Sequence, residues 1–594
     1  MEVIMVDMKA KPFNLTDEDC KWVEDTIADM SLDEKIGQLF FNMGSSRTEE
    51  YLKMTVNDYH IGGVRYNPGK AEEIHEQNRI LQENSKIPLI IACNTENGGD
   101  GACTDGTMIG SQTKIAATGN VDYAYELGRM ANKEAAAIGC NLSFAPVSDI
   151  LYNWENPVIG LRTYGNDPER VAAMTKAYLD GAHENPGFCC AAKHFPGDGL
   201  DFRDQHVANS VNTMNCEEWD KTFGMVYQNL IDNGLEAIMA GHIMQPAYAR
   251  HYNPDITEDE MMPATLSPEL IRGLLRGKLR FNGMVLTDAS HMVGLTCRMK
   301  RSEVLPAAIE AGVDMFLFFN EMEEDFASMK QGYLDGRISE ERLDDALHRI
   351  LALKAHMGLH KKAKKEIVPP HEKLKEVVGC QEHIAMQKKI SDKAITLVKY
   401  KDKDVLPLTP ERYKRIMIVH VKGLSAPGLG ALFAGKSSPA EVLRDKLKAK
   451  GFDAFIYESP LDQMMKEVQE GKKPDLNMYF AGKTPIKEFR ENQDLIITLV
   501  DIAGGFQPVA RPAFGMTKGG GEIPWYVFEL PVVVIGTGHP FVLADIPQAR
   551  TYINTYDSKD STLDALVTKL MTGEEAFTGK DPVDSFCGIF DTHI

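Results

Sequence analysis

Short apolar runs alternate with longer amphipathic stretches through roughly the first 350 residues of the chain. Each run is about as long as a strand and is nearly all apolar, which is typical of strands covered on both faces. The stretches between them, such as 121–139 and 167–184, have apolar positions at helical spacing. Eight such runs separated by helices predict a (β/α)8 barrel, with an open doubly wound sheet as the structural alternative. The runs begin at Ile36, Ile61, Ile87, Cys140, Cys189, Ala237, Gly283 and Asp314.

A second α/β region follows this pattern. An amphipathic helix is predicted at 338–360, and the basic, proline-containing segment KKAKKEIVPPHEKLKE after it is typical of an exposed linker. We therefore expect a catalytic barrel at 1–360, a linker at 361–385 and a C-terminal α/β domain at 386–594. Apolar runs that predict the second sheet begin at Tyr413, Phe452, Asp494, Leu530 and Ala549.

Composition narrows the class of protein. The 594 residues include 65 Lys and Arg against 86 Asp and Glu, a net charge of −21. Such a surface repels nucleic acid and anionic membranes, so we expect neither as a partner. The ten Cys form no CxxC pair, which favours a reduced, intracellular protein. No apolar stretch approaches the ~20 residues of a membrane-spanning helix, and residues 1–20 lack the features of a signal peptide. We expect a cytoplasmic monomer or homodimer.

Polar side chains stand where several of the apolar runs end. Barrel enzymes place their reactive groups at the C-terminal ends of the strands, so these side chains are expected to converge on one mouth. Asp288 directly follows the run MVLT, and a carboxylate held rigidly there can attack an anomeric carbon and form a covalent glycosyl-enzyme. The structural alternative is that Asp288 caps the next helix. The candidates are Asn94, Glu96, Asp149, Lys193, His194, His242 and Asp288.

The loop KHFPGDGLDFRDQH, residues 193–206, carries a candidate acid–base pair. Asp204 stands two residues before His206, so its carboxylate can accept one ring N–H and orient the other nitrogen outward. An imidazole with an ordinary pKa of ~6.5 can donate a proton near neutral pH and later recover it from water. An incidental Asp-x-His in a surface loop is the alternative interpretation.

Arg162 lies just after the fourth run, in NPVIGLRTYGNDPERV. Its guanidinium can grip hydroxyls or a carboxylate, or it can form a structural ion pair with Asp167. Metal and cofactor binding are not expected, because His194, His206 and His242 are far apart in sequence and form no HExxH or HxH pattern.

Taken together, these strings resemble glycoside hydrolase family 3, and specifically its β-N-acetylhexosaminidase (NagZ-like) branch. The resemblance covers nearly the whole chain, and in many members of that family a TIM barrel is followed by an α/β sandwich. The matching strings include MSLDEKIGQLF from Met30, APVSDI from Ala145, KHFPGDG from Lys193, RDQH from Arg203, GMVLTDASHM from Gly283 and AIEAGVDMFLF from Ala308.

The resemblance implies a role for each matching residue. Asp288 would be the nucleophile, and His206 paired with Asp204 the general acid/base. Arg162, Lys193 and His194 would hold the sugar, with Asp149, His242 and Met292 lining the same subsite. The implied reaction is retaining hydrolysis of terminal β-linked N-acetylglucosamine, typically from peptidoglycan or chitin fragments, without metal or cofactor.

Two strings depart from the family pattern. Asp198 stands in FPGDG where the family commonly has His, and NTENGGDG from Asn94 replaces a DQEGG-like string. No Asp falls at the position of the family's sugar-binding acid, and we expect Glu96 to reach the same hydroxyls instead.

Three alternatives remain open at this point. A family 3 β-glucosidase would usually take its acid/base from a Glu of the second domain, here Glu522 or Glu529. A phosphorylase is the second, because a His donor does not repel an incoming phosphate as a carboxylate does. The third is a non-catalytic sugar-binding protein, which only the altered NTENGG string favours.

Overall fold

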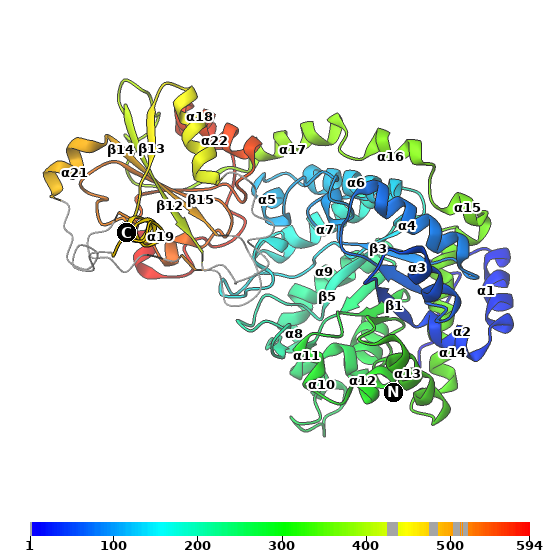
Figure 1. Cartoon of the computed structure of the whole chain (residues 1–594). Coiled ribbons are helices and arrows are strands. Elements are labelled where there is room, and N and C mark those ends of the chain that lie inside the picture. Colours follow the sequence, from blue (N-terminus) through cyan, green and yellow to red (C-terminus); the bar gives the residue numbers. More distant parts are fainter. Residues whose placement is uncertain (1–2, 424–437, 474–484, 503–510, 513, 515–520) are drawn as a thin grey trace. The chain divides into compact units, whose positions relative to one another are not determined.

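The computed structural model describes residues 3–423, 438–473, 485–502, 511–512, 514 and 521–594 (Figure 1). The chain forms two compact units. The first comprises Met1–Gln112 and Asn120–Gln387, and the second comprises Thr113–Gly119 and Lys388–Ile594. The short segment 113–119 thus belongs to the second unit although it lies within the barrel sequence.

The first unit is built on an eight-stranded parallel sheet in the order β10-β1-β2-β3-β4-β5-β7-β9. A parallel bridge between Leu286 and Met315 joins the two ends of this order and closes the barrel. Every strand of the sheet falls within one of the eight apolar runs, so the predicted (β/α)8 barrel is confirmed. The strands are β1 Phe40–Met43, β2 Gly63–Arg65, β3 Ile90–Cys93, β4 Leu142–Ser143, β5 Cys189–Phe195, β7 Ala237–Ala240, β9 Met284–Thr287 and β10 Phe316–Leu317. A separate two-stranded sheet pairs β6 Ser210–Val211 with β8 Ile243–Met244.

Helices surround the barrel strands, and their ends carry ordinary capping signals. Asp167 caps α7 by accepting a hydrogen bond from the Glu169 N–H, with Pro168 at the first helical position. The helices are α1 Asp17–Asp29, α2 Leu32–Gln38, α3 Glu49–Asn57, α4 Ala71–Asn84, α6 Asp122–Ala137, α7 Pro168–His183, α8 Cys216–Trp219, α9 Met225–Asp232, α10 Pro246–Tyr252, α11 Val293–Thr296, α12 Arg301–Ala311, α13 Met322–Leu334 and α14 Glu340–His356. A π-helical segment, Glu269–Lys278, precedes β9.

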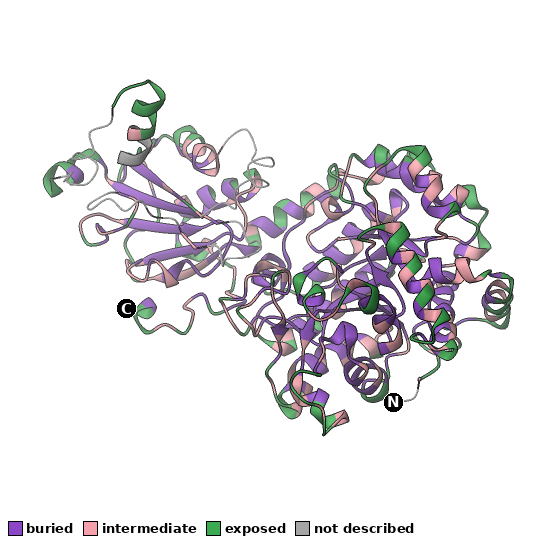
Figure 2. Cartoon of the chain, turned by 60° about the horizontal axis from the view of Figure 1, so that its bottom comes forward, coloured by how far each residue is buried: buried purple, intermediate pink, exposed green. Residues whose placement is uncertain are grey.

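Glycines let two neighbouring helices of the barrel, α6 and α7, approach closely. A Cβ atom on Gly128 would lie 2.1 Å from the Tyr178 carbonyl oxygen, and one on Gly181 would lie 2.0 Å from the Tyr125 carbonyl oxygen. Either contact is far inside van der Waals distance, so the helix pair requires glycine at both positions. Figure 2 shows that the strands are mostly buried, while exposed residues lie on the outer sides of the helices and in loops.

The segment 361–385, expected to be a linker, contains helices. They are α15 Lys364–Ile367, α16 His371–Val377 and the start of α17 Gln381–Ala394. Leu374 of α16 is buried, and His383 of α17 is buried against Glu134 of α6, with 2.6 Å between His383 Nδ1 and Glu134 Oε1. These contacts attach the segment to the barrel unit.

The second unit holds a six-stranded sheet in the order β11-β16-β15-β14-β12-β13. All neighbours are parallel except β11, which runs antiparallel to β16 and was not among the predicted strands. The strands are β11 Thr396–Tyr400, β12 Arg415–Lys422, β13 Asp453–Ile456, β14 Leu495–Asp501, β15 Val532–Gly536 and β16 Thr551–Asn554. The helices are α5 Gln112–Ala117, α18 Pro439–Ala449, α19 Pro460–Gln469, α21 Ile486–Asn492 and α22 Asp560–Thr572. With the barrel, this unit confirms the predicted α/β fold class.

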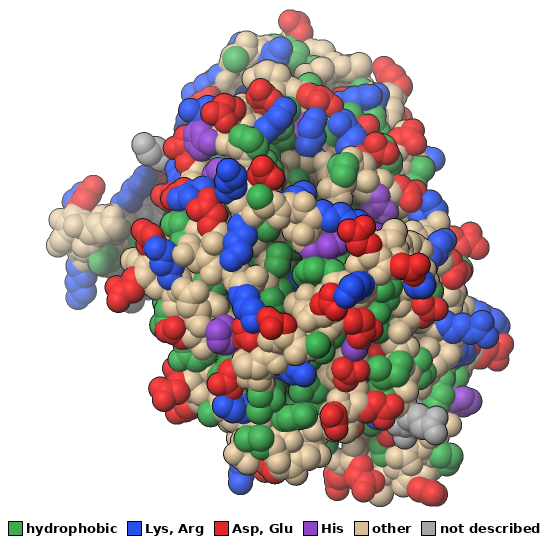
Figure 3. Space-filling model, turned by 90° about the vertical axis from the view of Figure 1, so that its right-hand side faces the viewer, with side chains coloured by type: hydrophobic (Ala, Val, Ile, Leu, Met, Phe, Trp, Pro, Cys, Tyr) green, Lys and Arg blue, Asp and Glu red, His purple; other side chains and the backbone are tan. Residues whose placement is uncertain are grey.

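Charged side chains of both signs are interspersed on the face drawn in Figure 3. Many pair across one helical turn, as Lys21 and Asp25 do at 2.7 Å on α1. In the described part of the chain, no helix is both long enough and apolar enough to cross a membrane.

Candidate active site

The polar residues predicted at strand ends stand at the carboxyl ends of parallel strands. Glu96 follows β3, Asp149 follows β4, and Asp288 directly follows β9. Lys193 and His194 are the last but two and last but one residues of β5, and His242 follows β7. Because parallel strands direct these ends toward one face of the barrel, the structure brings the predicted residues into a single mouth.

Glu96 lies between two cationic side chains. Its carboxylate accepts two hydrogen bonds from Arg162, from Nε at 2.9 Å and from Nη2 at 3.0 Å, and one oxygen lies 2.5 Å from Lys193 Nζ. Burial alone would raise the pKa of the Glu96 carboxyl, but the charges of Arg162 and Lys193 hold it well below its usual range. Asp167, the alternative partner for Arg162, caps α7 instead. The cluster therefore presents a fixed array of donors around one buried carboxylate.

Asp288 has a nearby histidine whose orientation is fixed from behind. His194 Nε2 lies 3.9 Å from Asp288 Oδ2, and Nδ1 of the same ring lies 2.7 Å from Asp149 Oδ2. The Asp288 Oδ1 atom accepts a hydrogen bond of 2.7 Å from the Ala289 N–H. Burial tends to raise the pKa of the Asp288 carboxyl, but the His194 and His242 rings and this N–H bring it below its ordinary value. An ionised carboxylate that is partly buried and rigidly held, as Asp288 is, can serve as the nucleophile that forms a glycosyl-enzyme.

The predicted Asp204–His206 pair is present. His206 Nδ1 lies 2.7 Å from Asp204 Oδ1, and the same oxygen accepts the His206 backbone N–H at 2.8 Å. The Asp204 side chain is wholly buried, whereas 30% of the His206 side chain is exposed. Because Nδ1 faces a buried carboxylate, a proton would be exchanged through Nε2 of this partly exposed ring.

The acid–base loop is attached to the segment that follows Asp288. The Val293 N–H donates to the His206 carbonyl at 3.0 Å, and the Gly294 N–H donates to the Gln205 carbonyl at 2.9 Å. Met292, predicted to line the sugar subsite, is 2% exposed and directly precedes these contacts. The strand carrying Asp288 therefore also positions the loop that carries His206.

His242 is buried, and both of its ring nitrogens have partners. Nδ1 lies 2.9 Å from Thr265 Oγ1 and Nε2 lies 3.0 Å from the Ala289 carbonyl oxygen. Burial lowers the pKa of the His242 ring, so the neutral form is favoured at neutral pH. Through its contact with the Ala289 carbonyl, the His242 ring holds the backbone of the residue that follows Asp288.

Asp198 stands in FPGDG where the family commonly has His, and its side chain is buried and hydrogen-bonded. Its Oδ1 accepts hydrogen bonds from Asn156 Nδ2 at 2.8 Å and from the Gly199 N–H at 2.7 Å. The Asp198 N–H itself donates to Asp149 Oδ1 at 2.7 Å. Burial and the Asp149 charge raise the pKa of the Asp198 carboxyl to about 7. At neutral pH this position therefore carries only part of a negative charge.

One basic residue at the barrel mouth was missed from the sequence. Arg65 is the last residue of β2, which places it at the same end of the barrel as the predicted set. Burial lowers the pKa of its guanidinium, and the Glu96 charge opposes that effect. A signal was present in the sequence, because Arg65 is the one charged residue near the end of the apolar run IGGVRY that begins at Ile61.

The two glutamates considered as alternative acids lie in the second unit. Glu529 forms an ion pair with Arg490, and Glu522 lies seven residues before it in the same segment.

Comparison with known proteins gives a family match over more than half of the chain. Residues 31–353 match the model described as the glycosyl hydrolase family 3 N-terminal domain. The chain is 37% identical over 592 residues to a "Beta-N-acetylglucosaminidase/beta-glucosidase" of Cellulomonas fimi, covering 99% of this chain and 100% of that protein. It is 31% identical over 258 residues to a "Beta-hexosaminidase" of Haemophilus influenzae, covering 42% of this chain and 70% of that protein.

Solved structures resemble the whole chain as well. The structure titled "Beta-glucoside phosphorylase BglX" superposes with a TM-score of 0.88 at 37% identity, covering 98% of this chain and 99% of that one. A β-N-acetylglucosaminidase from Paenibacillus sp. str. FPU-7 superposes with a TM-score of 0.74 at 24% identity, covering 94% and 100%, and so shares the fold.

Proposed function

Because the chain belongs to glycosyl hydrolase family 3, we propose that it is a retaining exo-glycosidase acting on terminal β-linked N-acetylglucosamine, as in peptidoglycan or chitin fragments. The observation that carries the proposal is the pairing of buried Asp204 with partly exposed His206 on a loop attached to the Asp288 segment. The relative with activity on both N-acetylglucosaminides and glucosides supports the same class of substrate.

The first step breaks the glycosidic bond. One Asp288 carboxylate oxygen attacks the anomeric carbon and forms a glycosyl ester while the exocyclic C–O bond breaks. Protonated His206 gives its proton to the departing oxygen, and Asp204 stabilises the ring in its charged form. His194, oriented by Asp149, stands beside the nucleophile and fixes the direction from which the sugar approaches.

The second step returns the enzyme to its starting state. Neutral His206 accepts a proton from water, and the resulting hydroxide equivalent attacks the anomeric carbon. The ester bond to Asp288 breaks and the carboxylate is regenerated. Two inversions give a product of the same anomeric configuration as the substrate.

The cluster of Glu96, Arg162 and Lys193 binds the hydroxyls of the terminal sugar. Its donors and its carboxylate are already fixed by one another, so little side-chain entropy is lost when a hydroxyl binds. Glu96 takes the place of the family's sugar-binding aspartate in this proposal.

The test compares two aryl β-glycosides that differ only at C2, the N-acetylglucosaminide and the glucoside, with Asp288→Asn as the blank. A kcat/KM at least ~10-fold higher for the N-acetyl sugar, about 1.4 kcal/mol of transition-state discrimination, supports the proposal. Preference for the glucoside would make the protein a β-glucosidase, and an α-configured product in an NMR time course would contradict retention.

Phosphorolysis is a second candidate, and one specific feature favours it. The proton donor is an imidazole, which becomes neutral after it gives up its proton, so it does not repel a phosphate anion arriving at the glycosyl ester as a carboxylate would. The full-length likeness to a structure titled a β-glucoside phosphorylase agrees with this. The same assay with added inorganic phosphate distinguishes the two, because a phosphorylase releases sugar 1-phosphate and a hydrolase releases free sugar.

A further inference from the structure

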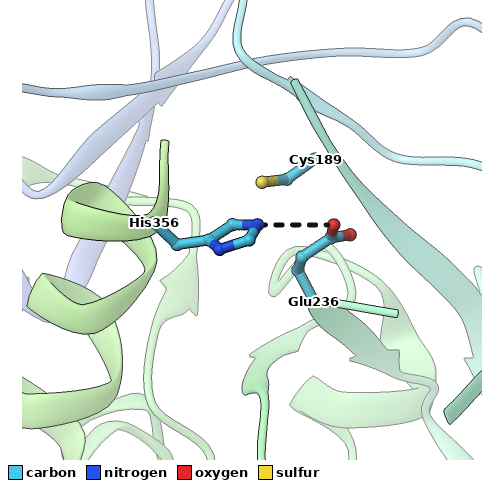
Figure 4. Close-up of side chains that lie close together, drawn as sticks. All are labelled: Cys189, Glu236 and His356. Carbon is cyan, nitrogen blue, oxygen red and sulfur yellow. Dashed lines mark ion pairs between the residues drawn. The ribbon is translucent and has the colours of Figure 1, made fainter. Parts of the chain in front are cut away.

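A second cluster of reactive side chains lies at the other end of the barrel from the candidate active site. Cys189 is the first residue of β5, and Glu236 directly precedes β7, so both stand where the strands begin. His356 is the last residue of α14. The Cys189 sulfur, a Glu236 carboxylate oxygen and a His356 ring nitrogen all lie within 4.8 Å of one another, and Figure 4 shows the three side chains directed at a common point.

Neighbouring groups fix the orientation of two of these side chains. His356 Nδ1 lies 2.8 Å from the Phe13 carbonyl oxygen, which makes Nδ1 the protonated nitrogen. The other nitrogen, Nε2, lies 3.9 Å from Glu236 Oε1 with its lone pair available. The remaining Glu236 oxygen, Oε2, accepts the Cys190 N–H at 3.1 Å. An imidazole held through Nδ1–H to a carbonyl is the usual second shell of a metal-binding histidine.

A fourth side chain contacts the same carboxylate. His183, the last residue of α7, has its Nε2 2.7 Å from Glu236 Oε1. His183 and His356 both end helices, and the partial negative charge at a helix C-terminus favours a cation nearby. About a third of each ring is exposed, 32% and 29% of the side chains, whereas Cys189 and Glu236 are buried. The site therefore has a solvent-facing side through which an ion can enter.

We propose that Cys189, Glu236 and His356 bind a single Zn²⁺ ion, with His183 holding the Glu236 carboxylate from outside. The donor set of sulfur, nitrogen and carboxylate oxygen is the one that Zn²⁺ prefers, while Mg²⁺ and Ca²⁺ require mainly oxygen. A thiolate and a carboxylate together neutralise the charge of the ion, which a largely buried site requires.

The geometry needs only a small adjustment. Zinc bond lengths of about 2.0 to 2.3 Å place tetrahedral ligands about 3.3 to 3.7 Å apart, and the three atoms lie within 4.8 Å of one another. Side-chain rotations that close this gap by about 1 Å would complete three corners of the tetrahedron and leave the fourth to water. The ion would tie the end of α14 to two adjacent barrel strands, so its role is structural.

This site is independent of the glycosidase proposal and of the histidines at the mouth, whose spacing gave no reason to expect a metal. It uses residues from three elements that are distant in sequence. A second local cluster, Cys380, Glu382 and His383, has similar ligand spacing in the described residues, but Glu382 is already paired with Arg129 at 2.6 Å. The experiment must therefore tell these two clusters apart.

The test uses the full-length protein stripped with a chelator and then given Zn²⁺ or Co²⁺ alone. We expect one Zn²⁺ per chain by elemental analysis after desalting, a thiolate-to-cobalt charge-transfer band in the Co²⁺ form, and a higher Tm with Zn²⁺. Cys189→Ser should abolish the charge-transfer band, and His356→Gln should weaken Zn²⁺ binding by at least ~100-fold. His183→Gln, which alters only the second shell, should weaken it by ~10- to 100-fold.

Cys190→Ser is the matched control. Cys190 is the next residue of the same strand and is equally buried, but strand alternation points its side chain to the opposite face. It should keep both the stoichiometry and the band. His356→Gln changes a partly exposed ring at a helix end, so it remains informative if Cys189→Ser fails to fold.

Three results would overturn the proposal. The first is a stripped protein that takes up no stoichiometric Zn²⁺, in which case the cluster is a hydrogen-bond network around Glu236. The second is binding that is equal in the wild type, Cys189→Ser and His356→Gln. The third is binding that is lost in His383→Gln and kept in Cys189→Ser.

Discussion

His194 stands between Asp149 and Asp288, with Nδ1 2.7 Å from the Asp149 carboxylate and Nε2 3.9 Å from the Asp288 carboxylate. Asp149 also accepts the backbone N–H groups of His194 and Asp198, at 3.2 and 2.7 Å. One wholly buried carboxylate thus fixes the ring beside Asp288, the proposed nucleophile, and the turn that begins the loop 193–206, which carries the proposed acid–base pair. Removing the Asp149 charge would therefore disturb both the His194 ring and this turn.

Replacing the nucleophile tests its assignment directly. Asp288→Asn keeps the side-chain volume but cannot form the glycosyl ester, so kcat should fall by at least ~10⁴-fold while the protein still folds. The measurement is steady-state turnover of an aryl glycoside together with a thermal melt. Asp167→Asn is the control, because Asn is also a good N-cap for α7 and activity should be retained. Near-normal turnover of Asp288→Asn would rule out this nucleophile.

The acid–base assignment predicts a dependence on the leaving group. His206→Ala should slow cleavage of poor leaving groups by ~10²- to 10⁴-fold, since these need a proton to depart. For activated nitrophenyl glycosides, the rate of the first step should fall much less. The check is a plot of log(kcat/KM) against leaving-group pKa, which should be steeper for the variant. A uniform loss across the series would assign His206 to binding.

We predict that Glu96 holds two cations in place as well as the sugar, the buried Lys193 and the partly exposed Arg162. Glu96→Gln leaves Arg162 and Lys193 without their carboxylate. We therefore expect the free energy of unfolding to fall by about 3 to 5 kcal/mol. We expect kcat/KM to fall by ~10²-fold or more. Denaturant melts and kinetics measure the two effects. The matched control is the more solvent-accessible pair of Arg79 and Glu83, and we expect Glu83→Gln to lower the free energy of unfolding by less than about 1 kcal/mol. Equal costs at the two sites would contradict the buried-pair interpretation.

Asp198 predicts a specific pH dependence of stability. Its folded-state pKa of about 7 lies above the value of ~3.9 expected when unfolded, so between these values the folded protein binds the extra proton and loses stability as the pH rises. Asp198→Asn removes this titration. Relative to the wild type, the variant should gain about 2 to 3 kcal/mol of stability between pH 5 and pH 8.

The measurement is the difference in unfolding free energy between the two proteins at each pH. Titrations that both proteins share cancel in this difference. A difference that stays constant from pH 5 to pH 8 would show that Asp198 is ionised throughout, as an ordinary exposed aspartate is.

The barrel and its mouth were predictable because they follow from local properties of the chain. A strand covered on both faces must be apolar along its whole length, so each barrel strand appears in the sequence as a short apolar run. A polar residue at the end of such a run, such as Asp288, must then lie at the mouth. The Asp204–His206 pair was readable for the same reason, since its partners are two residues apart. Strand β11 was missed because only two of its five residues are buried, which leaves no continuous run.

Tertiary structure alone decided which charges neutralise one another. Glu96 pairs with Arg162 across 66 residues of sequence, and Lys114 is buried within the second unit against Asp557, 443 residues away. Cys189, Glu236 and His356 likewise meet only when the barrel closes against α14. Sequence determines whether a position is buried, because that depends on its own side chain and near neighbours. The partner of a buried charge depends on the closure of the whole sheet, which no local pattern records.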